Sequence, residues 1–270
     1  MKIILNTKEL KKELKINHNL GFVPTMGSIH KGHEHLINRS MKECKKTLVS
    51  IFINPMQFNN KKDFKNYPKN IKKDLLILKR LKVDYVFIPK VNDVYSFKRK
   101  KIIKLNKTDL VLCAKYRKGH FEGVLDVMDR LTKLISPNKI FMGEKDFQQY
   151  NFVKKFLESR YKINIVKCKT VRASNKVALS SRNLLLKRKD FLKAGVIINE
   201  LIKLKKKISK SSKPNQHLIF KKNDLIKKYK IDIEYLELRN IKSFKKSNTL
   251  KNSKIFIAYY LNKIRLIDNL

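Results

Sequence analysis

Apolar and polar positions along the first 170 residues follow two periodicities. Short apolar runs rich in β-branched residues and bounded by turn residues are typical of buried parallel strands, whereas apolar positions three and four residues apart predict amphipathic helices. Strands are predicted at 20–25, 47–54, 83–89, 138–144 and 162–168. Helices are predicted between them, at 33–46, 67–82, 123–136 and 145–160. This alternation predicts an α/β domain with a doubly wound parallel sheet.

The pattern changes after about residue 170. Helical spacing recurs at about 187–207 and 218–229, and apolar runs follow at 231–239, 254–261 and 263–269 with short turns between them. Consecutive strands with short connections are typical of an antiparallel sheet. We therefore expect two domains, residues 1–170 and a smaller α+β domain at residues 171–270. The lysine-rich stretch 98–107 is expected to be solvated strand or loop surface.

The composition favours a folded protein without a membrane anchor. Of the 270 residues 42% are hydrophobic, and no apolar run approaches the roughly 18 residues that indicate a membrane-spanning helix. The opening MKIILNTKELKKELK lacks the long apolar stretch and the cleavage site of a signal peptide. The three cysteines lie far apart and form no CxxC pair, so we expect reduced thiols in a cytoplasmic protein.

A formal net charge of +43 raises a second hypothesis, a basic nucleic-acid-binding protein built on a decayed enzyme fold. Lysine outnumbers arginine 54 to 11, and the lysines are spread along the whole chain. Phosphate and base recognition relies more on the planar fork of arginine. The charge therefore indicates general enrichment in lysine, with weak nonspecific attraction to polyanions, rather than specific nucleic-acid recognition.

The stretch GFVPTMGSIHKGHEHLI, residues 21–37, concentrates scarce residues, with three of the six histidines and three of the seven glycines. It leaves the predicted strand 20–25 and enters the next helix, at the sheet edge where open α/β sheets bind ligands. Gly27 allows a tight turn, and the helix N-terminus favours an anion. His30 and His33 share a helix face, where two imidazoles suit a phosphate whose charge grows during displacement.

A metal site is the alternative interpretation of these histidines. However, Ile37 stands where an HExxH motif needs its second histidine, and no Cys or Asp joins the cluster locally, so we predict no metal site. The chain also has no Walker A loop and no GxGxxG, which argues against P-loop and dinucleotide-binding enzymes. Isolated histidines are usually ordinary surface or core residues, and this interpretation applies to His18, His35 and His217.

Three further motifs carry candidate chemistry. SIFINPMQF (50–58) and FMGEKDFQQ (141–149) each end a predicted strand, and KTVRASNKVALSSRN (169–183) joins the two predicted domains. Amides there can hold hydroxyls or a carboxylate, the lysine can meet a phosphate, and hydroxyls with a guanidinium can clamp one. The candidates are Asn54, Gln57, Gly143, Lys145, Asp146, Gln149, Ser180, Ser181 and Arg182.

Together with GHFEGVLDVMDRL and the terminal YLELRN and RLIDNL, these motifs resemble the pantothenate synthetase (pantoate–β-alanine ligase) family in order and in spacing. The segment His30-Lys31-Gly32-His33 resembles the HxGH signature of the wider nucleotidyltransferase superfamily. NPMQF, GEKDFQQ and LSSRN are specific to the narrower family. The resemblance extends from about residue 20 to the last residue.

The resemblance implies a fold and a reaction. The fold would be a Rossmann-like domain binding nucleotide and pantoate, a smaller C-terminal lid, and a homodimer through the N-terminal domains. In the reaction, the carboxylate of (R)-pantoate would attack the α-phosphate of ATP, which carries Mg²⁺, and release pyrophosphate. The amine of β-alanine would then attack pantoyl adenylate, giving pantothenate and AMP. The site must hold that reactive adenylate away from water.

The resemblance also implies residue roles. His33 would be a proton donor, and His30 and Lys145 would support the transition state. The ATP-binding residues would be Met26, Gly27, Ser28, Ile29, His30, Lys31, Gly32, His33, Gly143, Glu144, Lys145, Asp146, Val171, Leu179, Ser180, Ser181 and Arg182. Gln57 and Gln149 would hold pantoate, and Gln57 would also meet β-alanine; their presence favours pantoate over a nucleotidyltransferase with a different acceptor. Weaker candidates are Asn54, Tyr67 and Arg117.

The chain departs from the family pattern at three places, one of which is Asp126, a polar change where the family usually has Thr. The family often has Ala-Leu where Ser28-Ile29 stand, a mild change. It often has Glu at the position of Ala173 and Asp-Gly at Asn175-Lys176. We therefore expect this loop to be stiffer or differently placed, with an effect on closure of the lid.

Overall fold

The computed structural model describes residues 1–15, 19–96, 103–209 and 211–270, so His18 and residues 98–102 lie outside the described residues. The chain forms two compact units: Met1–Asn106 with Arg117–Thr170, and Lys107–Tyr116 with Val171–Leu270. The segment Lys107–Tyr116, which the sequence pattern places in the first domain, therefore belongs to the second unit. Its contacts are with strands more than a hundred residues later, which a local pattern does not reveal.

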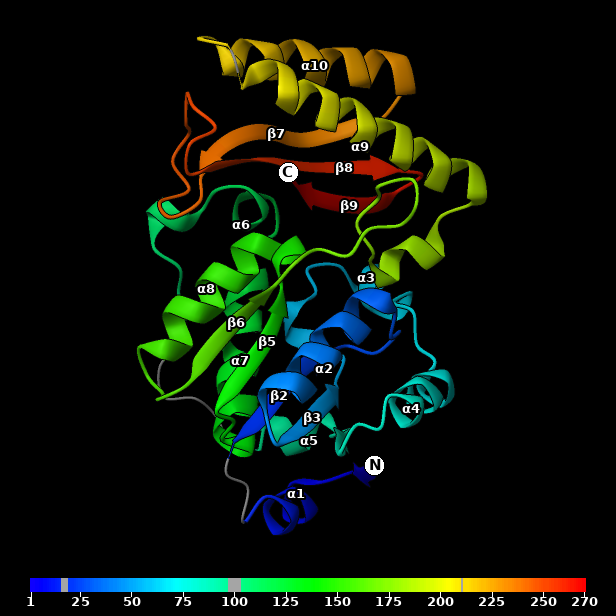
Figure 1. The fold of residues 1–270 in the computed structure, drawn as a ribbon, viewed down its shortest axis with the longest axis vertical. Coiled ribbons are helices and arrows are strands. Elements are labelled where there is room, and N and C mark those ends of the chain that lie inside the picture. The colour runs from blue at the N-terminus through cyan, green and yellow to red at the C-terminus, as the bar shows by residue number, and fades with distance from the viewer. Residues whose placement is uncertain (16–18, 97–102, 210) are drawn as a thin grey trace. The chain divides into compact units, whose positions relative to one another are not determined.

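The first unit contains a six-stranded parallel sheet in the order β1-β4-β3-β2-β5-β6 (Figure 1). Its strands are β1 (Lys2–Ile4), β2 (Leu20–Thr25), β3 (Lys46–Ile51), β4 (Tyr85–Phe87), β5 (Lys139–Gly143) and β6 (Asn164–Cys168). From β2 the strands β3 and β4 follow outward in one direction, with β1 at that edge, and β6 follows β5 in the other direction. The predicted doubly wound parallel sheet is thus confirmed, and its switch point lies between β2 and β5.

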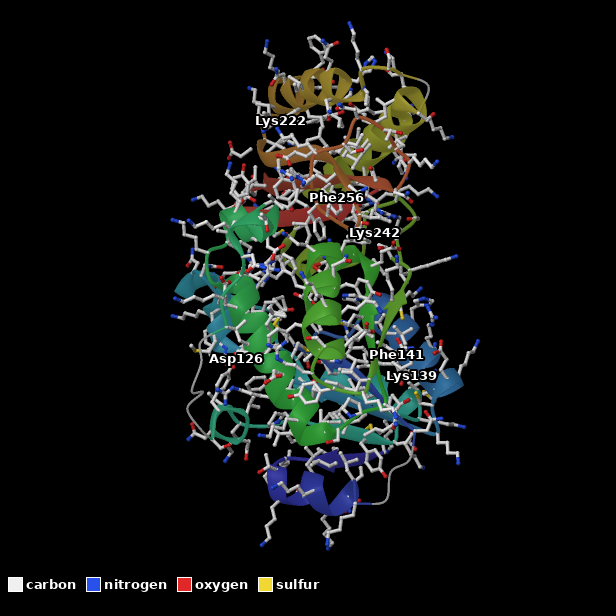
Figure 2. The ribbon with its side chains drawn as sticks, turned by 90° about the vertical axis from the view of Figure 1, so that its left-hand side faces the viewer. Asp126, Lys139, Phe141, Lys222, Lys242 and Phe256 are labelled. Atoms are coloured by element: carbon white, nitrogen blue, oxygen red, sulfur yellow. The ribbon has the colours of Figure 1, made fainter. Side chains whose placement is uncertain are left out.

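Helices flank this sheet. They are α1 (Thr7–Glu13), α2 (Lys31–Glu43), α3 (Lys61–Lys65), α4 (Ile71–Arg80), α5 (Val91–Val94), α7 (His120–Ile135) and α8 (Phe147–Glu158), with short 3₁₀ turns η1 (Pro55–Gln57) and η3 (Glu144–Asp146). Ile37 of α2 and Leu78 of α4 share a core with Val49 and Phe141 of the sheet. On β5, Phe141 is fully buried while the Lys139 ammonium pairs with Glu43 of α2 at 3.1 Å (Figure 2). Buried apolar faces therefore fix the helices to the sheet.

The second unit is an α+β layer pair, as predicted. Its antiparallel sheet has the order β7 (Asp232–Asn240), β8 (Ser253–Leu261) and β9 (Ile264–Asn269), and α9 (Arg188–Ile208) and α10 (Pro214–Tyr229) cover one face (Figure 1). The short elements η2 (Lys107–Asp109), α6 (Cys113–Tyr116) and η4 (Ser181–Leu185) complete it. No helix of the described residues is long and apolar enough to cross a membrane.

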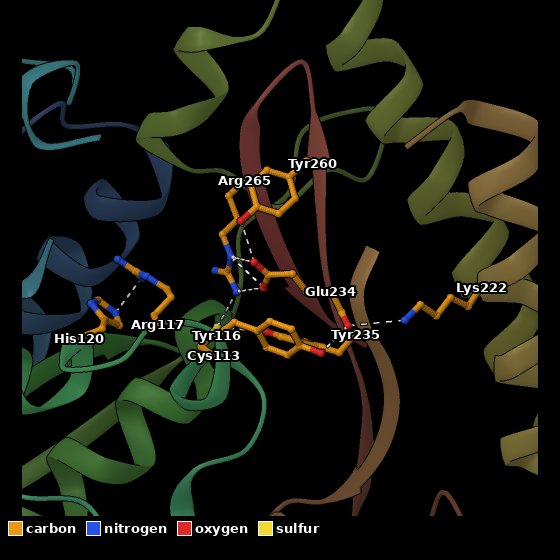
Figure 3. Close-up of polar contacts among 9 residues, drawn as sticks. All are labelled: Cys113, Tyr116, Arg117, His120, Lys222, Glu234, Tyr235, Tyr260 and Arg265. Carbon is orange, nitrogen blue, oxygen red and sulfur yellow. Dashed lines mark hydrogen bonds and ion pairs between the residues drawn. The ribbon is translucent and has the colours of Figure 1, made fainter. Parts of the chain in front are cut away.

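A buried polar cluster holds α6 in the second unit (Figure 3). The Cys113 sulfur lies 3.0 Å from the Tyr235 hydroxyl, and Arg265 Nη2 donates to that sulfur at 3.4 Å. The same guanidinium makes a paired contact with both carboxylate oxygens of Glu234. The Tyr116 hydroxyl donates to the Glu234 carbonyl at 2.8 Å. Because the Cys113, Glu234, Tyr235 and Arg265 side chains are largely removed from water, their mutual hydrogen bonds are needed to offset desolvation.

Candidate functional site

Strands β2 and β5 run parallel at the switch point, so their carboxyl ends lie at the same edge of the sheet. Residues 21 and 22 of β2 pair with residues 139 and 140 of β5. β2 then leads through residues 26–29 into α2, and β5 leads through η3 into α8. Two of the predicted motifs, 24–33 and 141–149, thus leave neighbouring strands at the place where open α/β sheets bind ligands.

A buried aspartate shapes the loop between β2 and α2. Gly27 and Ser28 both have left-handed backbone, with φ of +80° and +52°. The Asp74 carboxylate of α4 accepts the N–H of Ser28 at 2.9 Å and that of Ile29 at 2.7 Å. A Cβ atom at Gly27 would lie 2.9 Å from Asp74 Oδ2, so glycine is required by both conformation and space. Sequence reasoning missed Asp74, because a carboxylate in a polar helix start carries no local sign of its distant partner.

His30 and His33 form a capping box at the N-terminus of α2. His30 is the N-cap residue, and its Nδ1 accepts the Gly32 N–H at 3.1 Å. The His30 N–H donates to His33 Nδ1 at 3.4 Å, and the two rings stack with centroids 4.0 Å apart. Since each Nδ1 accepts a hydrogen bond, each neutral ring carries its proton on Nε2 and offers Nε2–H as a donor.

Both imidazoles are held in the neutral form. Burial, followed by the positive charge of Lys145, lowers the pKa of His30 from 6.5 to about 4, partly opposed by Asp146. Burial, His30 and Lys145 together lower the pKa of His33 well below 6.5. The positive charge of Lys145 is therefore close enough to lower the pKa of both rings. A cation and two neutral donors at a helix N-terminus form a strongly anion-attracting site.

The turn η3 carries the other predicted residues of the GEKD motif. Lys145 Nζ lies 3.4 Å from Asp146 Oδ1, and the Asp146 side chain is about half exposed. The Glu144 carboxylate pairs with Lys167 of β6 at 3.5 Å. Gly143 is the last residue of β5. The turn thus presents one cation and one accessible carboxylate near α2, while Glu144 is directed to β6.

Asn54 and Gln57 connect the end of β3 to the loop after β2. Asn54 is fully buried; its Nδ2 donates to the Gly123 carbonyl at 3.1 Å and to Gln57 Oε1 at 3.4 Å. Its Oδ1 accepts the Tyr95 hydroxyl at 2.8 Å. Gln57 Nε2 lies 2.8 Å from the Met26 sulfur. The structure therefore brings Gln57, a predicted pantoate-binding residue, into contact with Met26, a predicted ATP-binding residue. Asn54 forms hydrogen bonds that support both ends of η1.

His120 contacts the backbone of Gln57 and the side chain of Arg117, and Figure 3 shows the contact with Arg117. Its Nδ1 lies 2.8 Å from the Gln57 carbonyl, and its Nε2 lies 2.8 Å from Arg117 Nη1. A carbonyl only accepts and a guanidinium only donates, so His120 is the neutral ring with its proton on Nδ1. Sequence reasoning listed Arg117 as a weaker candidate and overlooked His120, whose only signal was its place in the GHFEG motif.

The remaining candidates take other positions. Gln149 is partly buried in the first turn of α8. Tyr67 is buried and packs edge-on against Phe58, with ring centroids 5.7 Å apart. Val171 and residues 179–182 belong to the second unit. Among the described residues, no group of three or more His, Cys, Asp or Glu side chains is arranged to hold a metal ion.

Within the second unit, residues 171–183 form a compact module. The Leu179 N–H donates to the Val171 carbonyl at 3.0 Å, closing a short antiparallel turn. Ser180 caps η4: its Oγ accepts the Arg182 N–H at 3.3 Å, and its own N–H donates to Asn183 Oδ1 at 2.6 Å. The predicted serine and arginine are therefore ordered at a 3₁₀-helix N-terminus.

Comparison with known proteins decides the family, because the sequence model of the pantoate-beta-alanine ligase family matches residues 2–270. The chain belongs to the pantoate–β-alanine ligase family. A pantothenate synthetase from Helicobacter pylori strain G27 is 38% identical over 279 residues, covering 100% of this chain and 98% of the relative. The match to the ligase family thus covers both units, and the resemblance inferred from the motifs is confirmed.

Solved structures of this ligase family share the fold. Pantothenate synthetase from Thermus thermophilus superposes with a TM-score of 0.93 at 28% identity, covering 100% of this chain and 99% of that one. Pantoate-beta-alanine ligase from Francisella tularensis, solved as a complex with beta-gamma ATP and beta-alanine, gives a TM-score of 0.86 at 33% identity, covering 100% and 97%. The predicted α/β fold and ligase class are both confirmed.

Proposed function

We propose that this chain joins (R)-pantoate to β-alanine through a pantoyl-adenylate intermediate, converting ATP to AMP and pyrophosphate. One observation carries the proposal. His30 and His33 lie at the N-terminus of α2, at the switch point of the sheet, and the positive charge of Lys145 lowers the pKa of both. The ligand complex of the Francisella tularensis relative supports ATP and β-alanine as substrates. Adenylation is the step that needs such an anion-stabilising site.

In the first step the pantoate carboxylate attacks the α-phosphorus. A carboxylate–phosphorus bond forms, the bond to the bridging oxygen breaks, and its electron pair leaves with pyrophosphate. The Nε2–H groups of His30 and His33 donate to the phosphate oxygens, and the Lys145 ammonium neutralises growing charge. The pKa values of both rings are lowered, so we propose the neutral rings as hydrogen-bond donors in this step. We therefore narrow the expected proton-donor role of His33 to that of a hydrogen-bond donor.

In the second step the β-alanine amine attacks the acyl carbon and a carbon–nitrogen bond forms. The bond from that carbon to the oxygen shared with phosphorus breaks, AMP leaves with this former carboxylate oxygen, and the amine releases a proton to water. Gln57 is proposed to bind pantoate and β-alanine, and Gln149 to bind pantoate. The contact of Gln57 with Met26 supports this assignment, because it places an amide beside the proposed phosphate loop. Asn54 and His120 hold the side chain and the backbone of Gln57 and so fix its position.

The nucleotide-binding set is proposed to include residues 26–33, 143–146, Val171 and 179–182. We propose that Mg²⁺ enters as part of the nucleotide substrate. The described residues offer no cluster of carboxylates, so the phosphates and water would supply most of its ligands and it would neutralise phosphate charge. We further propose a homodimer working in the cytoplasm, a location supported by three free thiols. Light scattering of the purified chain measures whether its mass is twice that of the monomer.

The reaction is tested with pantoate labelled with ¹⁸O in its carboxylate. ATP and Mg²⁺ are supplied, with pantoate and β-alanine each present or omitted, and pyrophosphate, AMP and pantothenate are measured. We expect pyrophosphate with pantoate alone, AMP release with both substrates, and one ¹⁸O atom in each AMP. Label-free AMP would contradict attack by the carboxylate. Absence of pantothenate from a folded protein would refute the proposed function and favour another acceptor or the nucleic-acid hypothesis.

The histidine site is tested by a matched pair on one helix. His33→Ala removes a proposed donor, whereas His35→Ala removes an exposed histidine two residues later. We expect the first variant to lose about 10²-fold or more in kcat and the second to match the parent. Equal kcat in the two variants would remove His33 from the chemistry.

A further inference from the structure

A partly buried ion pair ties the 171–183 module to the last strand of the chain. Arg172 Nη1 donates to Asp268 Oδ2 at 2.6 Å, and Nη2 donates to Oδ1 at 2.9 Å. Asp268 lies on β9 with a residue exposure of only 5%. The same guanidinium donates to the carbonyls of Asn269 at 3.2 Å and Lys176 at 2.9 Å. A paired arginine–carboxylate contact fixes orientation as well as distance.

Arg172 occupies a central place in the turn of that module. It bridges Ala178 in antiparallel register, one position inside the hydrogen bond between Val171 and Leu179. The hydrogen bond from the Ala173 N–H to the Val177 carbonyl continues the pairing. A guanidinium held at this paired position therefore fixes the backbone conformation of the residues on both sides of Arg172. Those residues include the proposed nucleotide-binding positions 171 and 179.

The tip of the turn has its own attachment. Asn175 Nδ2 donates to the Phe191 carbonyl of α9 at 3.0 Å, and Asn175 Oδ1 accepts the Val177 N–H at 3.3 Å. Asn199 Nδ2 donates to the Asn175 carbonyl at 3.3 Å. A Cβ atom at Gly195 would lie 2.7 Å from Asn175 Nδ2, so the side chain packs tightly on α9. Asn175 orients the tip, which leaves the Arg172–Asp268 pair to orient the base of the turn.

We propose that Asp268, acting through Arg172, is a positioning residue for the nucleotide. This inference rests on the proposed function, because it takes Val171 and residues 179–182 as nucleotide-binding. The ion pair holds the base of the turn in one arrangement before the nucleotide arrives, which avoids the entropic cost of ordering it on binding. Neither Asp268 nor Arg172 needs to touch the nucleotide for this effect.

The test measures binding of α,β-methylene-ATP by calorimetry and steady-state kinetics in parallel. Asp268→Asn keeps the shape of the side chain and removes its charge; Arg172→Lys keeps the charge and removes the paired geometry. We expect each variant to raise the Kd of the analogue and the KM for ATP about 10-fold, with the KM for pantoate changed less than about 2-fold. The double variant should be no worse than the poorer single variant, because both remove one interaction.

Glu200→Gln is the control in the same unit. Glu200 on α9 pairs with Lys221 at 3.1 Å and Lys228 at 2.9 Å, so its loss perturbs a comparable ion-pair cluster away from the turn. We expect this variant to bind the analogue like the parent. An unchanged Kd in Asp268→Asn and Arg172→Lys overturns the inference, and so does an equal rise in Glu200→Gln. Binding is measured without turnover, so an inactive parent refutes the proposed function separately.

Discussion

Replacement of Asp74 by alanine tests what holds the backbone of residues 26–29, the loop that we propose binds phosphate. The Asp74 carboxylate is 1% exposed and accepts two backbone N–H groups, those of Ser28 and Ile29, which are themselves buried. A buried N–H left without a partner costs about 1–3 kcal/mol, so the two together predict a loss of about 4 kcal/mol in the free energy of unfolding. The left-handed backbone at Gly27 and Ser28 also loses the carboxylate that holds it in this conformation. We therefore expect kcat/KM for ATP to fall at least about 10-fold.

Urea unfolding followed by far-ultraviolet circular dichroism measures the stability change, since the chain has no tryptophan for fluorescence. Asp93→Ala is the matched control. Asp93 lies in the first turn of α5 and accepts one exposed N–H, that of Lys90 at 2.9 Å. Its loss should cost about 1 kcal/mol and leave ATP kinetics unchanged. A loss below about 1 kcal/mol in Asp74→Ala would refute the argument that the two hydrogen bonds hold the loop.

Three further predictions concern pH, packing and backbone strain. The pKa of His30 is lowered from 6.5 to about 4 in the folded protein, so between these pH values the unfolded state binds more protons than the folded state. The free energy of unfolding should therefore fall by at most about 3 kcal/mol as the pH falls from 6.5 toward 4. Urea unfolding at each pH should show this loss, and His30→Gln should flatten it. A Cβ atom at Gly123 would lie 2.3 Å from the Met56 carbonyl oxygen, so Gly123→Ala should lower the free energy of unfolding by about 1–3 kcal/mol; unchanged stability would contradict the close packing of α7 on η1. Lys176 has φ of +73°, so Lys176→Gly should stabilise the protein by about 0.5–1 kcal/mol, and a lower unfolding midpoint would show that the lysine side chain offsets its strain.

Local patterns in the sequence predicted most elements and the candidate residues of the site. Strand β2 occupies residues 20–25 as predicted, because an apolar, β-branched run that ends in turn residues indicates a buried strand. Helix α2 begins at Lys31, two residues earlier than predicted, since His30 itself caps it. β1 escaped prediction because only Ile4 of its three residues is buried. The motifs made His30, His33, Lys145 and Gln57 candidates because each motif combined unusual residues with the end of a predicted strand.

Tertiary structure alone decided which distant groups meet. The order of the strands places β5 beside β2, and this neighbourhood brings the charge of Lys145 to the histidines. The Asp74 clamp spans 45 residues and the Arg172–Asp268 pair spans 96, and no local pattern encodes either partner. The segment 107–116 joined the second unit for the same reason. Hydrophobic periodicity reports whether a residue is buried, whereas the choice of a hydrogen-bond partner depends on where folding places both groups.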